Sequence, residues 1–289
     1  MTTLVAWASY QNSLPSCLTI ASDSRFTWGS EKIRWDCGRK TFWCKSGTEI
    51  FGYAGDVVTQ SNTLSQICEL VDYSTVLNDK SDADQRHAIF LKLFQSAFEA
   101  QVDVPKRGMV AFHGTRQNQP TETGRDRKSN APPPNPFRLW KMRYDASTDT
   151  WIDEEHKFPD KIDERKIDKA MFPELALAAG TGAGAFRTRR DINFKRYGYT
   201  SRAIFSALTH AIGPDGDQRS GGPTQATSLG LNGAPKPIGF YIDGCRSVAG
   251  MQLGEIGMGG TIEWRNNDFE FIRGSDLERA SGAPKYFFW

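Results

Sequence analysis

The order in which strand-like and helix-like segments follow one another most constrains the fold of this chain. Short apolar segments rich in β-branched and aromatic residues occupy the region up to Ala54. Apolar residues at three- and four-residue spacing then predict helices over Val57–Leu77 and Asp82–Val102. More strands precede two further predicted helices, Ala185–Tyr197 and Ser201–Ile212, and strands return after them. This order lacks the strand–helix alternation of a parallel sheet. We therefore expect an α+β protein with four layers, αββα, in which two antiparallel sheets are stacked between helical layers.

The individual strands are predicted from short apolar runs that turn residues separate. Lys45-Ser46-Gly47 indicates a hairpin, and the N-terminal part is expected to form a β-meander. The predicted strands are Thr3–Ala8, Cys17–Ala21, Lys40–Cys44, Thr48–Ala54, Gly108–Phe112, Phe137–Tyr144, Thr150–His156, Leu175–Ala179, Pro223–Leu229, Ile238–Ile242, Thr261–Trp264 and Phe269–Ile272.

The length of 289 residues suits one large domain or two small ones, and no linker-like segment divides the chain. We therefore expect a single domain over residues 1–289. Residues 115–136 are rich in Arg, Asn, Pro and Ser, which is typical of a flexible surface loop. A charged insert at about 158–173 and a Gly-rich C-terminal extension at about 243–289 complete the expected organisation.

Composition disfavours several classes of function. The chain has 36 Lys and Arg against 34 Asp and Glu, so nothing indicates a basic binder of nucleic acid or membranes. No apolar run approaches the roughly 18–20 residues that span a bilayer. The five cysteines show no C-x-x-C spacing and the four histidines stand alone. We therefore expect no metal, no cofactor and a reduced, cytoplasmic compartment.

Four motifs in the N-terminal part carry possible chemistry. The chain opens with Met1-Thr2-Thr3, and removal of Met1 would leave Thr2 with a free α-amine. Asp23-Ser24-Arg25 follows the second predicted strand. Lys40 stands at the start of a later strand, and Gly52-Tyr53-Ala54-Gly55-Asp56 leads into the first helix. A threonine whose own amino group acts as the base is one of the few nucleophiles that need only a single residue.

Two motifs in the C-terminal half complete a set of six. They are Ala179-Gly180-Thr181-Gly182 and Asp217-x-x-Ser220-Gly221-Gly222. Asp215 competes with Asp217 as the acid of the second motif, and the three-residue spacing to Ser220 favours Asp217. In this order the six motifs resemble those of the N-terminal-nucleophile (Ntn) hydrolases of the proteasome β-subunit type, which include the bacterial HslV peptidase. The resemblance covers roughly residues 2–113 and 137–230, and Thr181 stands where the family has serine.

The resemblance implies a threonine-type endopeptidase in which the Thr2 hydroxyl attacks an amide carbonyl. The α-amine of Thr2 would be the base, because an unperturbed α-amine has a pKa of about 7.7–8. Lys40 would favour the developing alkoxide electrostatically, and Asp23 would orient Lys40. Asp217 and Ser220 would fix the amine.

The resemblance assigns further residues to the expected site. Thr181 would add a hydroxyl to the network around the amine, and the backbone N–H of Gly55 would bind the oxyanion. Arg25, Gly221 and Gly222 would support the site. The pocket for the residue before the cleaved bond would be lined by Phe26, Gly38, Tyr53 and Val57, although the same side chains could equally form the core.

The implied partners are further copies of the chain in a self-compartmentalising ring or spiral, a peptide or unfolded-protein substrate, and an ATP-dependent unfoldase. Two alternatives stay open. The scaffold could carry an amidohydrolase that acts on a small non-peptide amide, or it could be a catalytically idle structural subunit. Retention of Met1 would block the Thr2 amine and favour the idle subunit.

Overall fold

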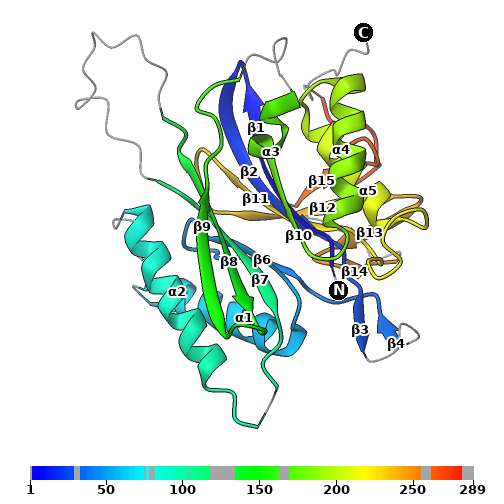
Figure 1. Cartoon of the computed structure of the whole chain (residues 1–289). Coiled ribbons are helices and arrows are strands. Elements are labelled where there is room, and N and C mark those ends of the chain that lie inside the picture. The colour runs from blue at the N-terminus through cyan, green and yellow to red at the C-terminus, as the bar shows by residue number, and fades with distance from the viewer. Residues whose placement is uncertain are drawn as a thin grey trace, which may run out of the picture.

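The computed structural model describes residues 2–28, 33–74, 76–77, 82–103, 105–117, 134–162, 169–254 and 262–281. Two extended β-sheets face each other, and two long helices cover the outer side of each sheet (Figure 1). The architecture therefore follows from which strands belong to which sheet and which helices cover them.

The larger sheet is formed mainly by the ends of the chain. Its strands are β1 Leu4–Gln11, β2 Leu14–Ser22, β10 Ala176–Ala179, β11 Gln225–Gly230, β12 Lys236–Ile242, β13 Cys245–Val248, β14 Met251–Gln252, β15 Glu263–Arg265 and β16 Phe271–Ile272. Their order is β10-β1-β2-β11-β12-β13-β14, with β15 joined to β12 and β16 to β15. The pairs are antiparallel except for β12 with β15, which is parallel.

The smaller sheet is a simple antiparallel succession of neighbouring strands. They are β5 Thr41–Trp43, β6 Ile50–Ala54, β7 Met109–Arg116, β8 Phe137–Asp145 and β9 Thr150–His156. A separate two-stranded ribbon, β3 Phe26–Trp28 and β4 Ile33–Trp35, lies in the connection between β2 and β5.

The helices are α1 Val57–Tyr73, α2 Ala83–Glu99, α3 Phe172–Leu175, α4 Ala183–Tyr197 and α5 Ser201–Ile212, and a short 3-10 turn, Lys169–Met171, precedes α3. The side chains of Asp56, Asp82 and Thr200 accept hydrogen bonds from the first turns of α1, α2 and α5. Such N-caps satisfy backbone donors that a helix leaves free and define where these helices begin. Within the described ranges, no helix has the length and apolar character needed to cross a membrane.

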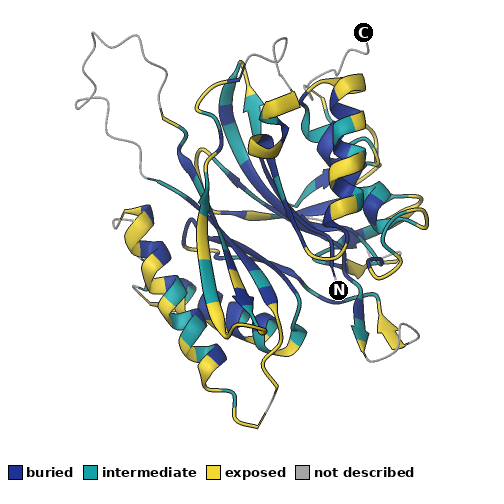
Figure 2. Ribbon diagram, in the orientation of Figure 1, coloured by how far each residue is buried: buried dark blue, intermediate teal, exposed yellow. Residues whose placement is uncertain are grey.

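Three buried apolar clusters separate the layers. The inner cluster joins the two sheets, with Leu4 and Ile20 from one and Phe112 from the other. One outer cluster packs α4 and α5 on the larger sheet, and the other packs α1 and α2 on the smaller sheet. In Figure 2 the strands between the helices are mainly buried, whereas the outer sides of the helices are exposed. The order of layers is therefore helices, sheet, sheet, helices.

The predicted α+β class with antiparallel sheets and long helices is confirmed, and the long helices begin and end close to their predicted bounds. The expected N-terminal β-meander is wrong. The first hairpin, β1 with β2, belongs to the larger sheet, whereas β5 with β6 belongs to the smaller sheet. The strands β1 and β6 are largely buried on both faces, so stacking in two sheets covers them better than one sheet with a solvent-exposed face.

Other differences concern short or irregular segments. The strands β3, β4, β13 and β14 were not predicted because two to four residues give too little periodicity. Thr115 and Arg116, expected to begin the 115–136 loop, instead extend β7. The rest of that loop from 118 to 133, residues 163–168 of the charged insert and residues 255–261 and 282–289 of the C-terminal extension lie outside the described residues.

The inner core generates a stability prediction. Phe112 on β7 is fully buried between the sheets, so Phe112→Ala should lower the free energy of unfolding by about 3–5 kcal/mol through the lost ring and the cavity left behind. Val58→Ala is the control, because Val58 is 65% exposed and the change should stay within about 0.5 kcal/mol. Urea unfolding followed by circular dichroism measures both. A loss below about 1 kcal/mol for Phe112→Ala would contradict this core.

Candidate active site

Thr2 and Thr3 lie at the start of β1, between two strands that bring other motifs to them. The residue after Thr3 pairs with the last residue of β10 on one side and with the last residue of β2 on the other. The Gly180–Gly182 turn follows β10 and Asp23 follows β2, so both flank the threonines. Thr2 is 2% exposed and Thr3 is fully buried. The register of the larger sheet therefore assembles the first part of the site.

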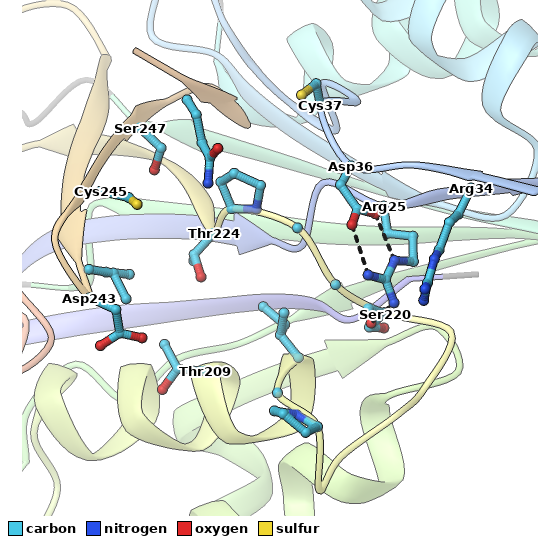
Figure 3. Close-up of a pocket in the computed structure, with 18 of the residues that line it drawn as sticks. Arg25, Arg34, Asp36, Cys37, Thr209, Ser220, Thr224, Asp243, Cys245 and Ser247 are labelled. Carbon is cyan, nitrogen blue, oxygen red and sulfur yellow. Dashed lines mark hydrogen bonds and ion pairs between the residues drawn. The ribbon is translucent and has the colours of Figure 1, made fainter. Parts of the chain in front are cut away.

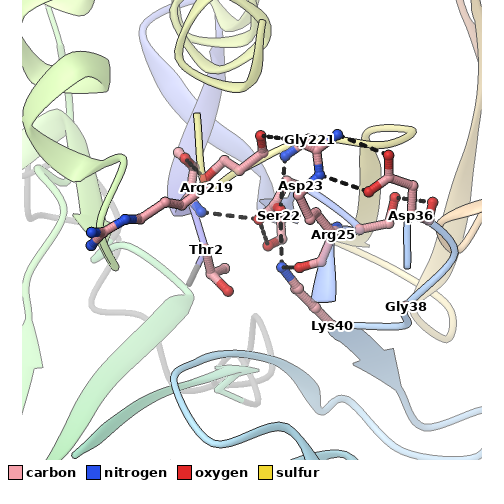
Figure 4. A network of polar contacts seen from close by, with 12 residues as sticks. Thr2, Ser22, Asp23, Arg25, Asp36, Gly38, Lys40, Arg219 and Gly221 are labelled. Atoms are coloured by element: carbon pink, nitrogen blue, oxygen red, sulfur yellow. Dashed lines mark hydrogen bonds and ion pairs between the residues drawn. The ribbon is translucent and has the colours of Figure 1, made fainter. Parts of the chain in front are cut away.

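The Asp23 carboxylate is the common acceptor of four segments. Its Oδ1 accepts the Thr3 backbone N–H at 3.0 Å, and its Oδ2 accepts the Lys40 ammonium at 3.0 Å. The same Oδ2 accepts the backbone N–H groups of Arg25 at 3.1 Å and Gly221 at 3.2 Å. Figure 4 shows Thr2 and the end of Lys40 on the same side of this network. One buried carboxylate thus connects the predicted lysine to the peptide that follows Thr2.

Lys40 is held without access to bulk water. Its side chain is 1% exposed, and the ammonium also donates to the Arg25 backbone carbonyl at 2.6 Å. Burial lowers the pKa of Lys40 below that of a free lysine, and the opposing effect of Asp23 offsets this only in part. A lowered pKa means that the Lys40 ammonium gives up its proton more readily than that of a free lysine.

A second chain of hydrogen bonds reaches Thr2 from the C-terminal half. The Thr2 backbone N–H donates to Thr181 Oγ1 at 3.3 Å, and the Thr181 hydroxyl donates to Asp217 Oδ2 at 2.5 Å. Ser220 donates to the same Asp217 oxygen at 3.0 Å, and the hydroxyls of Ser220 and Thr3 are 2.8 Å apart. The Thr181 hydroxyl therefore links the Thr2 backbone N–H to the Asp217 carboxylate.

The hydrogen bonds of this loop distinguish Asp217 from Asp215, the other candidate acid of the motif. Asp217 accepts both hydroxyls, whereas Asp215 is exposed in the same loop. The backbone N–H of Ser220 also donates to the Asp217 carbonyl at 2.9 Å, which closes a tight turn. The three-residue spacing to Ser220 therefore places Asp217, and not Asp215, in the network.

Two glycines allow the turn after β10 to approach Thr2 and Thr3. A Cβ on Gly180 would lie 2.0 Å from the Thr2 carbonyl oxygen, and φ at this residue is +86°. A Cβ on Gly182 would lie 1.8 Å from Thr3 Oγ1. No side chain fits at either distance, so the Gly-Thr-Gly motif is a steric requirement of this contact.

The Ala54–Gly55 turn lies against the same backbone. A Cβ on Gly180, which would clash with Thr2, would also lie 3.3 Å from Ala54 Cβ. Gly55 follows at φ +113°, and a Cβ there would lie 2.7 Å from the Gly108 carbonyl oxygen. The end of β6, at Ala54, therefore lies beside the Gly180 turn.

Arg25 holds the loop that carries Ser220. Its guanidinium forms two hydrogen bonds with the Asp36 carboxylate, at 2.7 and 2.8 Å, and donates to the backbone carbonyls of Gln218 and Ser220 at 3.2 Å. The hydrogen bond from Arg25 lowers the pKa of Asp36. A Cβ on Gly221 would lie 2.4 Å from Arg25 Cζ, so glycine is needed for this contact.

Gly222 lies against Asp36, the residue that follows the β3–β4 ribbon. Gly222 has φ +71°, and a Cβ there would lie 2.7 Å from the Asp36 carbonyl oxygen and 2.9 Å from Ser24 Oγ. Asp36 was not predicted as a site residue. The only sequence signal for Asp36 is that a partly buried Arg25 needs a carboxylate partner. This signal does not say which Asp or Glu of the chain is that partner.

Gln225 is the second residue that sequence reasoning missed. Its side chain is fully buried on β11 and bonds to the backbones of both Asp23 and Lys40. A single glutamine at the start of an apolar strand carries no sequence signal for such a role. Its contacts appear only when the two sheets stack.

The residues expected to line a substrate pocket lie in or beside the core of this chain. Tyr53 is fully buried and Phe26 is 6% exposed, and both belong to the core between the smaller sheet and its helices. A Cβ on Gly38 would lie 2.3 Å from the Phe26 ring, so this ring already fills the space beside Gly38. Val57 packs against the same core. The sequence left open whether these side chains line a pocket or fill the core, because apolar residues follow the same pattern in both cases.

A cavity of about 830 Å³ lies on another side of the Ser220–Gly222 loop (Figure 3). Its lining residues include Arg34, Asp36, Thr224 and Cys245, whereas Thr2 is not among them. The cavity and the threonine network therefore share the loop, but the cavity does not include Thr2. Searched over the described ranges alone, the chain holds no cluster of His, Cys, Asp or Glu suited to a metal ion.

Comparisons with known proteins find similarity among solved structures alone. No family model and no curated protein matches the chain. Among solved structures, the chain is similar to a mutant of Anbu from Hyphomicrobium sp. strain MC1, with 9% sequence identity, a TM-score of 0.46, and coverage of 82% of this chain and 87% of that chain. This likeness is too distant to assign an activity, so the function is inferred from the geometry of the chain itself.

The glycine geometry generates a matched pair of variants. Gly182→Ala should lower the free energy of unfolding by about 1–3 kcal/mol, because the new methyl group displaces Thr3. Gly184→Ala, two residues on, meets no atom within 4 Å and should leave stability unchanged or raise it by up to about 1 kcal/mol. Denaturant unfolding compares them. Equal effects of the two variants would contradict the close approach of Gly182 to Thr3.

Proposed function

We propose that this protein is a threonine-type peptidase of the proteasome β-subunit kind, with Thr2 as the nucleophile after removal of Met1. The arrangement of two sheets between two pairs of helices is the one that the resemblance to Ntn hydrolases leads us to expect. The observation that carries the proposal is the buried Asp23 carboxylate, which bonds both the Lys40 ammonium and the N–H of the peptide after Thr2.

The proposed reaction begins with attack of Thr2 Oγ1 on the carbonyl carbon of a peptide bond. The α-amine of Thr2 takes the hydroxyl proton as the C–O bond forms, and the proton passes to the leaving amine as the C–N bond breaks. Water then attacks the resulting ester, with the same amine as base, and releases the second product and the free hydroxyl. No cofactor is needed to balance this sequence.

Lys40 would act on the hydroxyl and the amine together. Its positive charge stabilises the developing alkoxide and disfavours protonation of the neighbouring amine. The lowered pKa of Lys40, caused by burial, also permits it to relay the proton. Asp23 restricts the ammonium to one position by its bond of 3.0 Å.

The remaining polar residues would orient the amine and bind the oxyanion. Thr181 already accepts the N–H of Thr2, and Asp217 and Ser220 hold Thr181 and Thr3 in place. The Gly55 N–H is the proposed oxyanion donor, a group whose removal typically costs about 3–4 kcal/mol of barrier stabilisation. Arg25, Gly221 and Gly222 keep the Ser220 loop in position.

The proposal extends to assembly and substrate. We expect copies of the chain to form a ring or spiral around the active sites, to cleave peptides or unfolded proteins, and to receive them from an ATP-dependent unfoldase. Light scattering measures the assembly, and a stable monomer would contradict this part. Hydrolysis of small amides without cleavage of any peptide would favour the amidohydrolase alternative.

The central test compares two substitutions at Thr2. Thr2→Ala should reduce hydrolysis of fluorogenic peptides by at least about a thousandfold, because the nucleophile is lost. Thr2→Ser keeps the hydroxyl and is the matched control, so it should retain measurable hydrolysis. Circular dichroism verifies that both variants fold.

Intact-mass measurement completes this test. The wild-type protein should have lost Met1, since only then is the Thr2 amine free to act as base. Fully retained Met1, or equal activity in wild type and Thr2→Ala, would overturn the proposal.

A further inference from the structure

The amide of Gln225 joins the two sheets beneath the proposed site. Its Oε1 accepts the backbone N–H groups of Lys40 at 2.8 Å and Thr41 at 3.1 Å. Its Nε2 donates to the backbone carbonyls of Asp23 at 3.0 Å and Gly38 at 2.7 Å. Both N–H donors and the acceptor oxygen of the amide are therefore satisfied inside the protein.

These four bonds connect backbones that strand pairing does not connect. Asp23 follows β2, which pairs with β1 and β11, whereas Lys40 precedes β5, which pairs with β6 in the other sheet. The ribbon of β3 and β4 lies between them in the sequence. The separation of the Asp23 carboxylate from the Lys40 ammonium thus depends on how the two backbones are held.

We propose that Gln225 is a positioning residue that keeps Asp23 and Lys40 at the right separation beside Thr2. This proposal rests on the proposed function, in which the two side chains act on the Thr2 hydroxyl. Gln225 contacts neither Thr2 nor the ammonium through any described hydrogen bond, and it acts through the two backbones. A displacement of about 1 Å in such a constellation can cost about a hundredfold in rate.

The first experiment uses Gln225→Met and a matched control. Gln225→Met preserves the size of the side chain and removes all four bonds, so kcat should fall at least about tenfold with KM little changed. Asn193→Leu is the control, because Asn193 is also a buried amide, 2% exposed, but lies on α4 and bonds the Ala203 carbonyl. It should cost stability and leave kcat unchanged.

Gln225→Glu supplies a readout that a merely structural role would not give. The ionised carboxylate of this variant still accepts the backbone N–H groups of Lys40 and Thr41. It cannot donate to the backbone carbonyls of Asp23 and Gly38. A protonated carboxyl regains one donor. The kcat of Gln225→Glu relative to wild type should therefore recover as pH falls, whereas the relative kcat of Gln225→Met should stay constant.

A chemical probe makes the test independent of activity. Cyanate carbamylates accessible, unprotonated amines, and mass mapping of peptides reports the rate at Lys40. In wild type the buried Lys40 should react slowly. Gln225→Met should raise the rate at least about tenfold, because the ammonium loses its fixed partner and becomes accessible. Asn193→Leu should not raise it.

The outcomes separate the two proposals. If wild type cleaves peptides while Gln225→Met keeps its kcat within about twofold and its Lys40 protected, the positioning role is overturned and the proposed function stands. If wild type with free Thr2 cleaves nothing and Gln225→Met still exposes Lys40, the proposed function fails and the positioning of the ion pair stands.

A second buried polar cluster, on the smaller sheet, carries an independent inference. His87 on α2 and His113 on β7 face each other with their Nδ1 atoms 2.9 Å apart. His113 Nε2 bonds the Glu49 carboxylate, and His87 Nε2 lies 3.0 Å from Asp153 Oδ2 on β9. His113 and Glu49 are fully buried.

The geometry determines the number of protons on this pair. Ionised carboxylates only accept hydrogen bonds, so each Nε2 carries a proton. At 2.9 Å one Nδ1 must donate to the other. Three protons are therefore distributed over four ring nitrogens, which gives the pair one positive charge. Burial lowers the pKa of His113 despite its bond to Glu49.

The charged groups around the two histidines balance the positive charge of the pair. Burial alone would raise the pKa of Glu49, but His113 and Arg86 outweigh it and keep the carboxyl ionised. Arg86 Nε donates to Glu49 at 2.9 Å from α2, and Thr115 Oγ1 donates at 2.8 Å from β7.

Aromatic rings enclose the two imidazoles. The His87 ring stacks on Trp140 of β8 at 4.3 Å, and Arg138 lies over the Trp140 ring at 5.0 Å. The His113 ring packs against Phe51 at 5.1 Å and Phe90 at 4.6 Å. The Glu49 and Asp153 carboxylates and the Arg86 and Arg138 guanidinium groups are thus the charges around the pair.

We infer that the proton shared by His87 and His113 holds α2 on the smaller sheet and makes this contact dependent on pH. Loss of the proton would leave two nitrogen lone pairs facing each other and one carboxylate uncompensated, so stability should fall as pH rises through that loss. Because the pKa of His113 is lowered on folding, its own contribution is present above about 6.5 and is lost as pH falls through the folded value. The two limbs give stability a maximum between them.

Histidine-selective ¹⁵N NMR tests the inference directly. At the pH of maximum stability, the pair should show three protonated ring nitrogens, and two would overturn the proposal. His87→Gln should remove the fall of stability at high pH and speed amide hydrogen exchange in α2. His210→Gln on α5 is the control and should leave both limbs in place. Retention of both limbs in His87→Gln would equally overturn the inference.

Discussion

The buried ion pair between Asp23 and Lys40 is the interaction on which the rest of the site depends. Removing one partner of such a pair leaves an uncompensated buried charge, which typically costs about 3–5 kcal/mol. The Asp23 carboxylate is further satisfied by N–H groups of Thr3, Arg25 and Gly221. The need to compensate one charge therefore brings β1, the start of β5 and the Ser220 loop to one point. Hydrogen bonds of this kind specify position more than they add stability.

The two-sheet architecture makes that convergence possible. The ends of β2 and β10 flank the start of β1, and the end of β6 reaches the same place from the facing sheet. Small residues at Gly180 and Gly182 allow the backbones to touch. The same principle operates at α2, where Glu49, His113 and His87 form a second satisfied polar network between a helix and a sheet. In both places a buried charge is tolerated because the polar groups around it form hydrogen bonds to it.

Local patterning accounted for much of the fold and for the order of the site motifs. The four long helices lie close to their predicted bounds, and the turn residues Lys45-Ser46-Gly47 predicted the β5–β6 hairpin. The motif spacing selected Asp217 over Asp215, and Asp217 does accept Ser220 and Thr181. The assignment of hairpins to sheets failed because a strand's pattern shows that it is buried and does not show against which sheet. For the same reason, the pattern did not decide whether Phe26 and Tyr53 line a pocket or fill the core.

The sequence by itself determined which segments become helices and strands and which residues are chemically able to act, because periodicity, turn residues and side-chain type are local properties. Only the tertiary structure decided that Gln225 bonds to the backbones of Asp23 and Lys40, that Asp36 holds Arg25, and that His87 and His113 face each other. Gln225 and Lys40 are 185 residues apart, and their hydrogen bond exists only after the two sheets have stacked. Contacts of this range depend on the three-dimensional meeting of backbones, which no local pattern encodes.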